Sequence, residues 1–173
     1  MLILLIGTSN SGKSRFAEKI ASRFPGPRIY AATMVPCGAA GAARVDKHRR
    51  QRAGRGFVTV ECPRGLDGIS AGKNALVLLE DVSNLLANEM FGRHDPRAED
   101  EALRQIVSLA GRVAVVIAVT IGGVSGDGCD EPTQNYAAAL AHLNEQLAEA
   151  ADAVIEIRAG TPLLLKGECP WIG

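Results

Sequence analysis

The sequence predicts an α/β fold in which a mainly parallel sheet is covered by helices on both faces. Short runs rich in leucine, valine and isoleucine alternate with longer segments of helical periodicity, and several of these runs are apolar at every position. A strand that is buried on both faces has this composition, because a parallel sheet carries helices on each side. A glycine-rich loop also follows the first run and opens the first helical segment. These observations indicate an open α/β sheet.

Seven strands are expected from the apolar runs, each bounded by glycine, proline or polar residues. They cover residues 2–6, 28–32, 57–61, 75–80, 113–120, 153–158 and 162–166. Only Ala159, Gly160 and Thr161 separate the last two runs. Three residues are too few for a parallel crossover, so the chain is expected to end in an antiparallel hairpin.

Five helices are expected between these strands. They cover residues 12–23, 42–51, 82–91, 97–110 and 133–150, and the pair Asp95 and Pro96 is a start signal for the fourth. Residues 122–132 are glycine-rich and acidic, which predicts a long loop after the fifth strand. Loops at the carboxyl ends of strands are where open α/β sheets bind ligands.

The bulk composition favours one domain over residues 1–173. The chain has 19 basic and 19 acidic residues and is 47% hydrophobic, which argues against disorder and against a strongly basic nucleic-acid surface. Its four cysteines form no C-x-x-C pair, as expected of isolated thiols in a reducing compartment. No window approaches the roughly 18 apolar residues of a membrane helix. We therefore expect a soluble cytoplasmic protein with no membrane span and no nucleic-acid partner.

The loop after the first strand has the spacing G-x-x-x-x-G-K-S, which is typical of a phosphate-binding loop, or P-loop. It consists of Gly7, Thr8, Ser9, Asn10, Ser11, Gly12, Lys13 and Ser14. The glycines let backbone N–H groups turn towards a phosphate, and the helix amino terminus adds partial positive charge. The lysine would reach the β and γ phosphates of a nucleotide triphosphate, and the final serine would coordinate Mg²⁺. The alternative, a glycine turn that matches by chance, does not explain the strand before the loop or the helix after it. The loop therefore predicts a three-layer P-loop NTPase fold of the RecA-like type.

A P-loop site also needs an acid at the end of a neighbouring strand to hold the water shell of the metal. Glu80 and Asp81 end the apolar run of residues 76–79, and either could serve. The alternative is an acid that only caps the following helix. The sequence leaves this choice open.

Five cations surround one histidine in the segment of residues 44–52. On a helix, Arg44 and His48 share a face at i and i+4, and Arg52 continues it. Such a row could hold nucleotide phosphates while His48 attacks as a nucleophile. The alternative is a solvated basic face with a surface histidine. The other histidines, His94 and His142, are assigned no function.

In order and spacing, the motifs resemble those of the bifunctional adenosylcobinamide kinase and adenosylcobinamide-phosphate guanylyltransferase family of cobalamin biosynthesis. The resemblance covers nearly the whole chain. It comprises the P-loop followed by Arg15 and Ala17-Glu18, then Tyr30-Ala31-Ala32-Thr33, Arg44-Val45-x-x-His48, Arg52, Val58-Thr59-Val60-Glu61, Leu78-Leu79-Glu80 with Asn88, Asn144-x-x-Leu147-Ala148, Ala151-Asp152-x-Val154 and Gly160-x-Pro162 through Lys166.

The resemblance implies two reactions on a corrinoid small molecule. ATP or GTP would phosphorylate the aminopropanol hydroxyl of adenosylcobinamide, and GMP from GTP would then pass to that phosphate through a guanylylated histidine. His48 occupies the matching position, and Lys13 with Mg²⁺ would take up the charge of the leaving pyrophosphate. The implied nucleotide contacts are the P-loop, Arg44, Arg52, Glu61 and Glu80, and the implied metal contacts are Ser14, Glu80 and Asp81. Family members are typically trimers, so a homo-oligomer is expected.

The sequence departs from the family pattern at three loop-side places. Charged residues that the family carries are missing at 37–41, 120–123 and 136–138. A tryptophan common in the family is replaced by Phe57, which is a mild change. The acids of the glycine-rich loop, Asp127, Asp130 and Glu131, are candidates to replace a lost carboxylate, although acids in surface loops are usually only solvated.

Two alternatives to the family's activity remain open. One is a P-loop kinase or nucleotidyltransferase that acts on another substrate. The other is a catalytically inactive nucleotide-binding regulatory protein. Glu80 with Asp81 argues against the second alternative, because a protein that only binds nucleotide does not need the metal acid.

Overall fold

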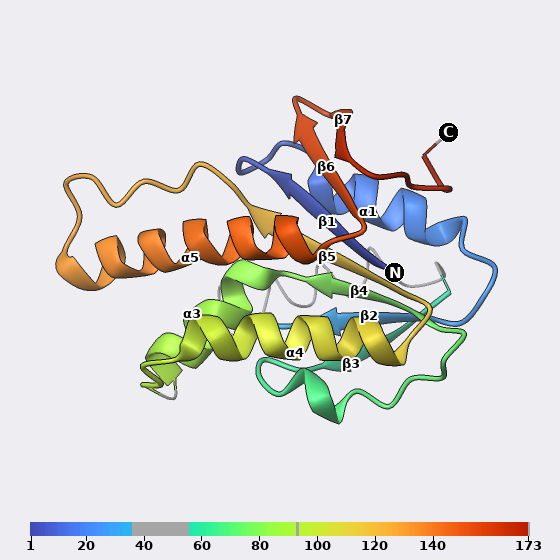
Figure 1. Cartoon of the computed structure of the whole chain (residues 1–173), viewed down its shortest axis with the longest axis horizontal. Coiled ribbons are helices and arrows are strands. Elements are labelled where there is room, and N and C mark those ends of the chain that lie inside the picture. Colours follow the sequence, from blue (N-terminus) through green and yellow to red (C-terminus); the bar gives the residue numbers. More distant parts are fainter. Residues whose placement is uncertain (36–55, 93, 173) are drawn as a thin grey trace.

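The computed structural model describes residues 1–35, 56–92 and 94–172, which form a seven-stranded sheet with the order β3-β2-β4-β5-β1-β6-β7 (Figure 1). Neighbouring strands run parallel except for the final pair, β6 and β7, which is antiparallel. The strands are β1 (Leu2–Gly7), β2 (Arg28–Ala32), β3 (Phe57–Glu61), β4 (Leu76–Glu80), β5 (Val115–Ile121), β6 (Ala153–Arg158) and β7 (Thr161–Lys166). The predicted sheet and C-terminal hairpin are confirmed.

The helices cover both faces of this sheet and give the three layers that were predicted. One face carries α1 (Lys13–Ser22), and the other carries α3 (Val82–Gly92), α4 (Ala98–Arg112) and α5 (Glu131–Ala150) (Figure 1). A short 3₁₀ helix, η1 (Leu66–Gly68), precedes β4 and was not predicted. The helix predicted over residues 42–51 lies outside the described residues.

The alternation of side chains along each strand divides the interior into two cores. In β1, Leu2 and Leu4 pack towards α3, α4 and α5, whereas Ile3 and Leu5 pack towards α1. Successive strand residues point to opposite faces, so a strand covered on both sides must be apolar throughout. This is the physical basis of the uninterrupted apolar runs.

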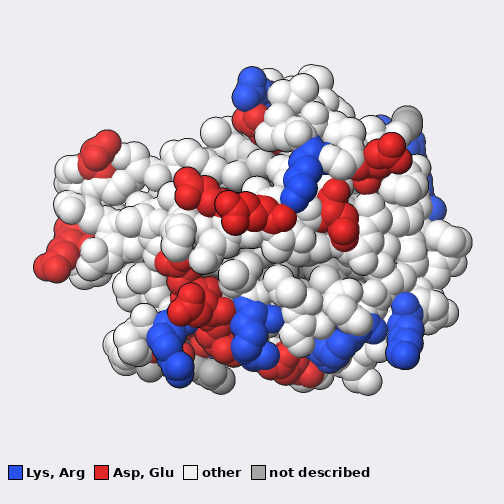
Figure 2. All heavy atoms as spheres, in the orientation of Figure 1, with Lys and Arg blue, Asp and Glu red and all other residues white. Residues whose placement is uncertain are grey.

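Acidic and basic side chains alternate on the outer surface of α4 and on η1. Figure 2 shows acidic and basic groups side by side over α4, where the Arg104 guanidinium pairs with Asp67 and Glu101, both at 2.7 Å. The pairs are partly exposed, so each contributes little to stability. They join η1 to the outer surface of α4, on the face away from α1.

Strand register brings two predicted site residues to the same level. Ala32 of β2 pairs with Glu61 of β3 on one side and with Glu80 of β4 on the other. All three are the last residues of parallel strands, so their side chains lie at the carboxyl edge of the sheet. Sequence position alone, 61 and 80, does not show this proximity.

Several element boundaries differ from prediction by one or two residues for local reasons. The last helix begins at Glu131, two residues early, because Asp130 caps it: Oδ1 of Asp130 accepts a hydrogen bond from the Thr133 N–H at 3.2 Å. Hydrogen bonds from the Thr133 side chain and then from its backbone N–H hold the pKa of Asp130 below its usual value. Pro132 then occupies the first turn, where its missing N–H costs nothing.

Within the described part of the chain, no helix combines the length and the apolar character needed to cross a bilayer.

Candidate functional site

The P-loop forms a tight turn between β1 and α1. Its backbone is left-handed at Asn10 (φ 59°) and at Gly12 (φ 93°), and the Ser11 N–H donates to the Thr8 carbonyl at 3.2 Å. Gly7 has no room for a side chain, since a Cβ there would lie 2.6 Å from Ser11 Oγ and 2.7 Å from the carbonyl oxygen of Ile157. The loop therefore has the close-packed turn that its glycines predicted.

Two distant segments hold this turn in place. The Gly160 N–H, in the turn of the β6–β7 hairpin, donates to the Ser11 carbonyl at 2.9 Å. The Gly122 N–H, just after β5, donates to the Gly7 carbonyl at 3.1 Å. These bonds fix both the start and the middle of the P-loop.

The Lys13 ammonium lies over the loop and donates to the Thr8 carbonyl at 3.0 Å. Partial burial lowers the pKa of this lysine, and the carboxylates of Asp81 and Glu80 partly oppose that shift. A partly desolvated ammonium that faces two acids is suited to hold anionic phosphate between itself and a bound cation.

Glu80 ends β4 and faces the P-loop across a cavity of about 310 Å³. Its Oε2 accepts a hydrogen bond from the hydroxyl of Tyr30 at 2.8 Å. Ser14, Glu61 and Asp81 line the same cavity. With Ser9 and Asn10 of the P-loop, six of the predicted nucleotide or metal contacts therefore line one cavity.

Asp81 performs the capping role that the sequence left open. Its Oδ1 accepts hydrogen bonds from the Asn84 N–H and the Ser83 hydroxyl, both at 2.6 Å, at the start of α3. Its backbone N–H donates to Thr33 Oγ1 at 2.8 Å, and that hydroxyl donates to the Asp81 carbonyl at 2.9 Å. Asp81 is thus a fixed part of the strand end, and its carboxylate accepts two hydrogen bonds where that of Glu80 accepts the one from Tyr30.

A hard cation suits the oxygen groups at this cavity, which are the Ser14 hydroxyl and the carboxylates of Glu80 and Asp81. Among the described residues, no three histidine, cysteine or acidic side chains gather closely enough to hold a metal by themselves. Mg²⁺ is commonly held by one or two protein groups together with water and substrate phosphates. The residues present fit that mode of binding.

Two residues that support the site were missed as functional residues. Tyr30 positions Glu80, and the only signal in the sequence is a tyrosine within an aliphatic strand. The Asn88 amide donates to the carbonyls of Thr33 and Pro63, both at 2.8 Å, and so fastens α3 to the ends of β2 and β3. Both residues belong to the quoted family motifs, but no role could be derived for them from spacing.

A neutral hydrogen-bonded pair lies at the end of β5, next to the place where the sequence departs from the family pattern. Thr120 is fully buried, and its hydroxyl donates to Asn144 Oδ1 of α5 at 2.7 Å. The Asn144 amide in turn donates to the Ile121 carbonyl at 3.0 Å. This neutral pair joins β5 to α5 and brings no negative charge to the phosphate-binding loop.

The acids of the glycine-rich loop do not bring a carboxylate to this cavity in its place. Asp130 caps α5, and neither Asp127 nor Glu131 is among the residues that line the Ser14–Glu80 cavity in the described structure. Residues 136–138 also lack charges that the family carries. There the Tyr136 hydroxyl donates a hydrogen bond to the Ser83 carbonyl at 3.1 Å. Burial raises the pKa of this tyrosine, so the group stays neutral.

Three predicted residues, Arg44, His48 and Arg52, lie outside the described residues. The two other histidines are described: His142 pairs with Glu99, and His94 adopts a left-handed backbone (φ 54°) before Asp95. Neither lines the cavity between the P-loop and Glu80.

A model of the family described as "Cobinamide kinase / cobinamide phosphate guanyltransferase" matches residues 3–165. The chain belongs to this family.

Curated relatives of the cobinamide kinase and guanyltransferase family align over nearly the full length. The bifunctional adenosylcobalamin biosynthesis protein CobU of Salmonella typhimurium is 28% identical, and the alignment covers 96% of this chain and 100% of that protein. The corresponding CobP protein of Pseudomonas aeruginosa is 31% identical, and the alignment covers 95% of this chain and 97% of that protein. The resemblance drawn from the motifs is thereby confirmed.

Solved structures that share the fold are more distant in sequence. The flagellar accessory protein FlaH of Methanocaldococcus jannaschii has a TM-score of 0.51 at 12% identity, covering 96% of this chain and 78% of its own. A KaiC-like protein of Pyrococcus horikoshii has a TM-score of 0.50 at 14% identity, and the match covers 96% of this chain and 79% of that protein. These likenesses support the P-loop NTPase fold alone.

Proposed function

We propose that this protein phosphorylates the aminopropanol hydroxyl of adenosylcobinamide with ATP or GTP, and then transfers GMP from GTP to the resulting phosphate. Membership of the family and the convergence of the P-loop with Glu80 support the proposal. It includes a cytoplasmic homotrimer, with nucleotide and corrinoid as the small-molecule partners and no nucleic acid. Mg²⁺ is the proposed metal.

In the first reaction the acceptor hydroxyl oxygen attacks the γ-phosphorus, and the bond from that phosphorus to the β–γ bridging oxygen breaks. Lys13 binds the β and γ phosphates, and the backbone N–H groups of the P-loop hold the β phosphate. Bound Mg²⁺ would neutralise phosphate charge, held by Ser14 and by Glu80 through water. The hydroxyl proton passes to a carboxylate at the same cavity, and Glu80 is the proposed acceptor.

In the second reaction a ring nitrogen of His48 attacks the α-phosphorus of GTP, and pyrophosphate leaves. GMP is then bound to His48 through a phosphorus–nitrogen bond. The phosphate of the acceptor attacks the same phosphorus, which forms the product diphosphate linkage and returns His48 to its free form. Arg44 and Arg52 are proposed to bind phosphate, together with Glu61 as a nucleotide contact.

One observation carries the proposal: Ser14 lines a small cavity with Glu80, whose carboxylate also acts electrostatically on Lys13. The P-loop and Glu80 lie at the ends of β1 and β4, which only β5 separates in the sheet. A protein that only bound nucleotide would not need an acid fixed there by a tyrosine. The arrangement supports phosphoryl transfer as the reaction class. The corrinoid acceptor and the histidine intermediate rest on the family.

The histidine intermediate has a direct chemical test. Incubation with Mg²⁺ and GTP labelled at the α-phosphorus is expected to leave a covalent label that is labile to acid and stable to base, as a phosphoramidate is. GTP labelled at the γ-phosphorus should leave none. His48→Ala should abolish the label, measured by autoradiography after denaturing electrophoresis.

The matched control is His142→Ala, because His142 is exposed and pairs only with Glu99 among the described residues. This variant should label as the wild type does. No label on a wild-type protein that binds GTP would eliminate the guanylyl-histidine step. A label that survives His48→Ala would assign the nucleophile to another residue.

The neutral Thr120–Asn144 pair favours a second candidate, a family member that uses a different acceptor. Its site would label with GMP in the same way but would not pass GMP to adenosylcobinamide phosphate. Chase of the labelled protein with that acceptor separates the two, because only the first candidate loses its label to a corrinoid product.

A further inference from the structure

The turn of the β6–β7 hairpin lies against the P-loop. Ile157 of β6 pairs with Gly7 of β1, so the residues that follow Ile157 pass the carboxyl edge of the sheet beside the P-loop. There the Gly160 N–H donates a hydrogen bond to the Ser11 carbonyl at 2.9 Å. We propose that this turn is a positioning element of the phosphate site, because it orients the peptide between Ser11 and Gly12 for phosphate binding. The inference rests on the proposed nucleotide binding and adds a residue on which the affinity for phosphate depends.

The peptide between Ser11 and Gly12 explains how a bond to a carbonyl can act on a phosphate. Across a trans, planar peptide bond, the carbonyl oxygen and the N–H of the next residue point in opposite directions. The Gly160 N–H holds the Ser11 carbonyl on one side of the loop, so the Gly12 N–H points to the other side. Among the described residues, this N–H has no hydrogen-bond partner. It can therefore donate to a phosphate at the start of α1, as the N–H groups of a P-loop do.

The Ser11 side chain does not hold this peptide. It is buried, and its hydroxyl oxygen lies 2.6 Å from the point where a Cβ on Gly7 would stand. That hydroxyl has no hydrogen-bond partner among the described residues. The Ser11 N–H donates to the Thr8 carbonyl at 3.2 Å, which fixes the peptide before Ser11 and not the one after it. In the described structure, the bond from Gly160 is therefore the hydrogen bond that holds the peptide between Ser11 and Gly12.

The conformation of the turn is what brings this N–H to the P-loop. Ala159 (φ 48°) and Gly160 (φ 82°) are both left-handed, which is characteristic of a type I′ hairpin turn. The left-handed conformation is strained at Ala159, because it is not a glycine. The Gly160 Cα lies 3.6 Å from the point where a Cβ on Gly12 would stand, so two glycines meet at this contact. A Cβ on Gly160 itself would meet no atom within 4 Å, so only the backbone conformation favours glycine there.

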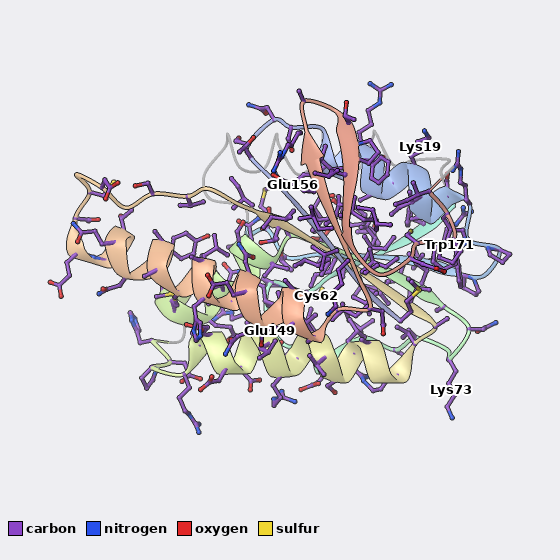
Figure 3. The ribbon with its side chains drawn as sticks, turned by 45° about the horizontal axis from the view of Figure 1, so that its top comes forward. Lys19, Cys62, Lys73, Glu149, Glu156 and Trp171 are labelled. Carbon is purple, nitrogen blue, oxygen red and sulfur yellow. The ribbon has the colours of Figure 1, made fainter. Side chains whose placement is uncertain are left out.

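The other end of the hairpin is held by α5. Every residue of β7 is exposed, so core packing does not fix this strand. The Lys166 ammonium donates to the carbonyls of Ala148 and Glu149 at 3.0 and 2.8 Å, where it also favours the negative end of the helix dipole. Figure 3 shows the hairpin extending from this end of α5, where Glu149 lies, along α1, which carries Lys19. The hairpin therefore has one anchor on α5 and a second on the P-loop.

The test makes the same substitution at two glycines. Gly160→Ala strains the turn without a steric clash. Gly128→Ala is the matched control, because Gly128 also has a positive φ (74°) and open space at its Cβ position, but lies in the glycine-rich loop after β5. Mg²⁺-tripolyphosphate and Mg²⁺-GTP are titrated into each protein by calorimetry. We expect Gly160→Ala to bind both ligands about tenfold more weakly, as for one lost hydrogen bond to an anion, and Gly128→Ala to change by less than about twofold.

Two further measurements separate positioning from stability. Both alanine variants should lose stability to a similar extent in urea, because each forces alanine into a left-handed conformation, so a loss of affinity in Gly160→Ala alone is not an effect of unfolding. Adding Ala159→Gly to Gly160→Ala relieves the strain at the neighbouring position and should recover most of the affinity. Replacement of Gly160 by glycolic acid, through nonsense suppression during translation in vitro, exchanges the N–H for an ester oxygen and should weaken GTP binding about tenfold.

The ester decides the outcome, since it removes the hydrogen bond and keeps the shape of the residue. Unchanged GTP affinity of the ester protein would overturn the inference and leave the proposed function intact. An equal loss of affinity in Gly160→Ala and Gly128→Ala would also overturn it, because the effect would then not depend on contact with the P-loop. A wild type that binds neither ligand would remove the proposed function and the inference together.

Discussion

Glu80 and Asp81 are adjacent in the chain, but their carboxylates have different hydrogen-bond partners. Asp81 accepts the bonds that start α3, whereas Glu80 holds a hydrogen bond from Tyr30 and faces the P-loop. The sequence identified both acids but could not separate them, because the difference lies in which N–H and O–H groups surround each carboxylate. Those groups come from α3 and from β2, which is distant in the chain.

The two acids should therefore separate stability from activity. Asp81→Ala is expected to lower the free energy of unfolding by about 1 kcal/mol, within the 0.5–2 kcal/mol typical of a lost helix cap. Glu80→Gln keeps the size of the side chain and should leave stability within about 0.5 kcal/mol, while phosphorylation of adenosylcobinamide falls at least about 100-fold. Urea unfolding and a coupled kinase assay provide the two measurements.

Tyr30→Phe is the matched control for this pair, because it removes only the hydroxyl that positions Glu80. Its turnover should lie between those of the wild type and Glu80→Gln. Full activity of Glu80→Gln with loss of activity in Asp81→Asn would assign the metal role to Asp81 instead.

At the scale of elements, the positions of strands and helices were predictable and the bonds between them were not. Apolar runs and the P-loop spacing located the strands and the first helix to within a few residues, because burial on both faces and glycine turns leave clear patterns. The pairing of Thr120 with Asn144 could not be found in this way. Neither residue is unusual in composition, and only the docking of α5 against β5 brings them together.

This buried pair should contribute measurably to stability. Thr120→Val keeps the shape of the side chain but leaves Asn144 Oδ1 without the donor that the hydroxyl provides. We expect the free energy of unfolding to fall by about 1–3 kcal/mol, the typical cost of an unsatisfied buried acceptor. Denaturant unfolding measures it.

Thr59→Val is the comparison for that experiment, since Thr59 is exposed on the edge strand β3. Its stability should change by less than about 0.5 kcal/mol. A loss of similar size in both variants would mean that the hydroxyl of Thr120 has no special role.

At the scale of the whole molecule, one edge of the sheet collects residues that are far apart in the chain. Parallel order places the ends of β1, β2, β3 and β4 along the same edge, so the P-loop, Glu61 and Glu80 meet there. The fold class alone predicted which edge binds ligand.

Ligand binding at this edge should stabilise the entire fold. A ligand that binds only the folded state adds about 2.7 kcal/mol at 100 times its Kd. For a chain of this length, that raises the Tm by roughly 5–10 °C. We expect this shift for Mg²⁺-GTP by differential scanning fluorimetry, none for Lys13→Ala, and a smaller one after Mg²⁺ is removed with EDTA.

Lys73→Ala should retain the shift, since Lys73 is exposed in the loop before β4. An undiminished shift in Lys13→Ala would mean that the nucleotide stabilises the protein from a site other than the P-loop.

The bond from Gly160 to Ser11 also orders events during synthesis on the ribosome. The supporting partners of the P-loop, which are β5, β6 and the hairpin turn, are translated more than a hundred residues after it. A nascent chain that lacks them has the phosphate-binding motif without the backbone that holds it in shape. We therefore expect nucleotide binding only after the hairpin turn has been translated, since this turn follows every other described segment that supports the P-loop.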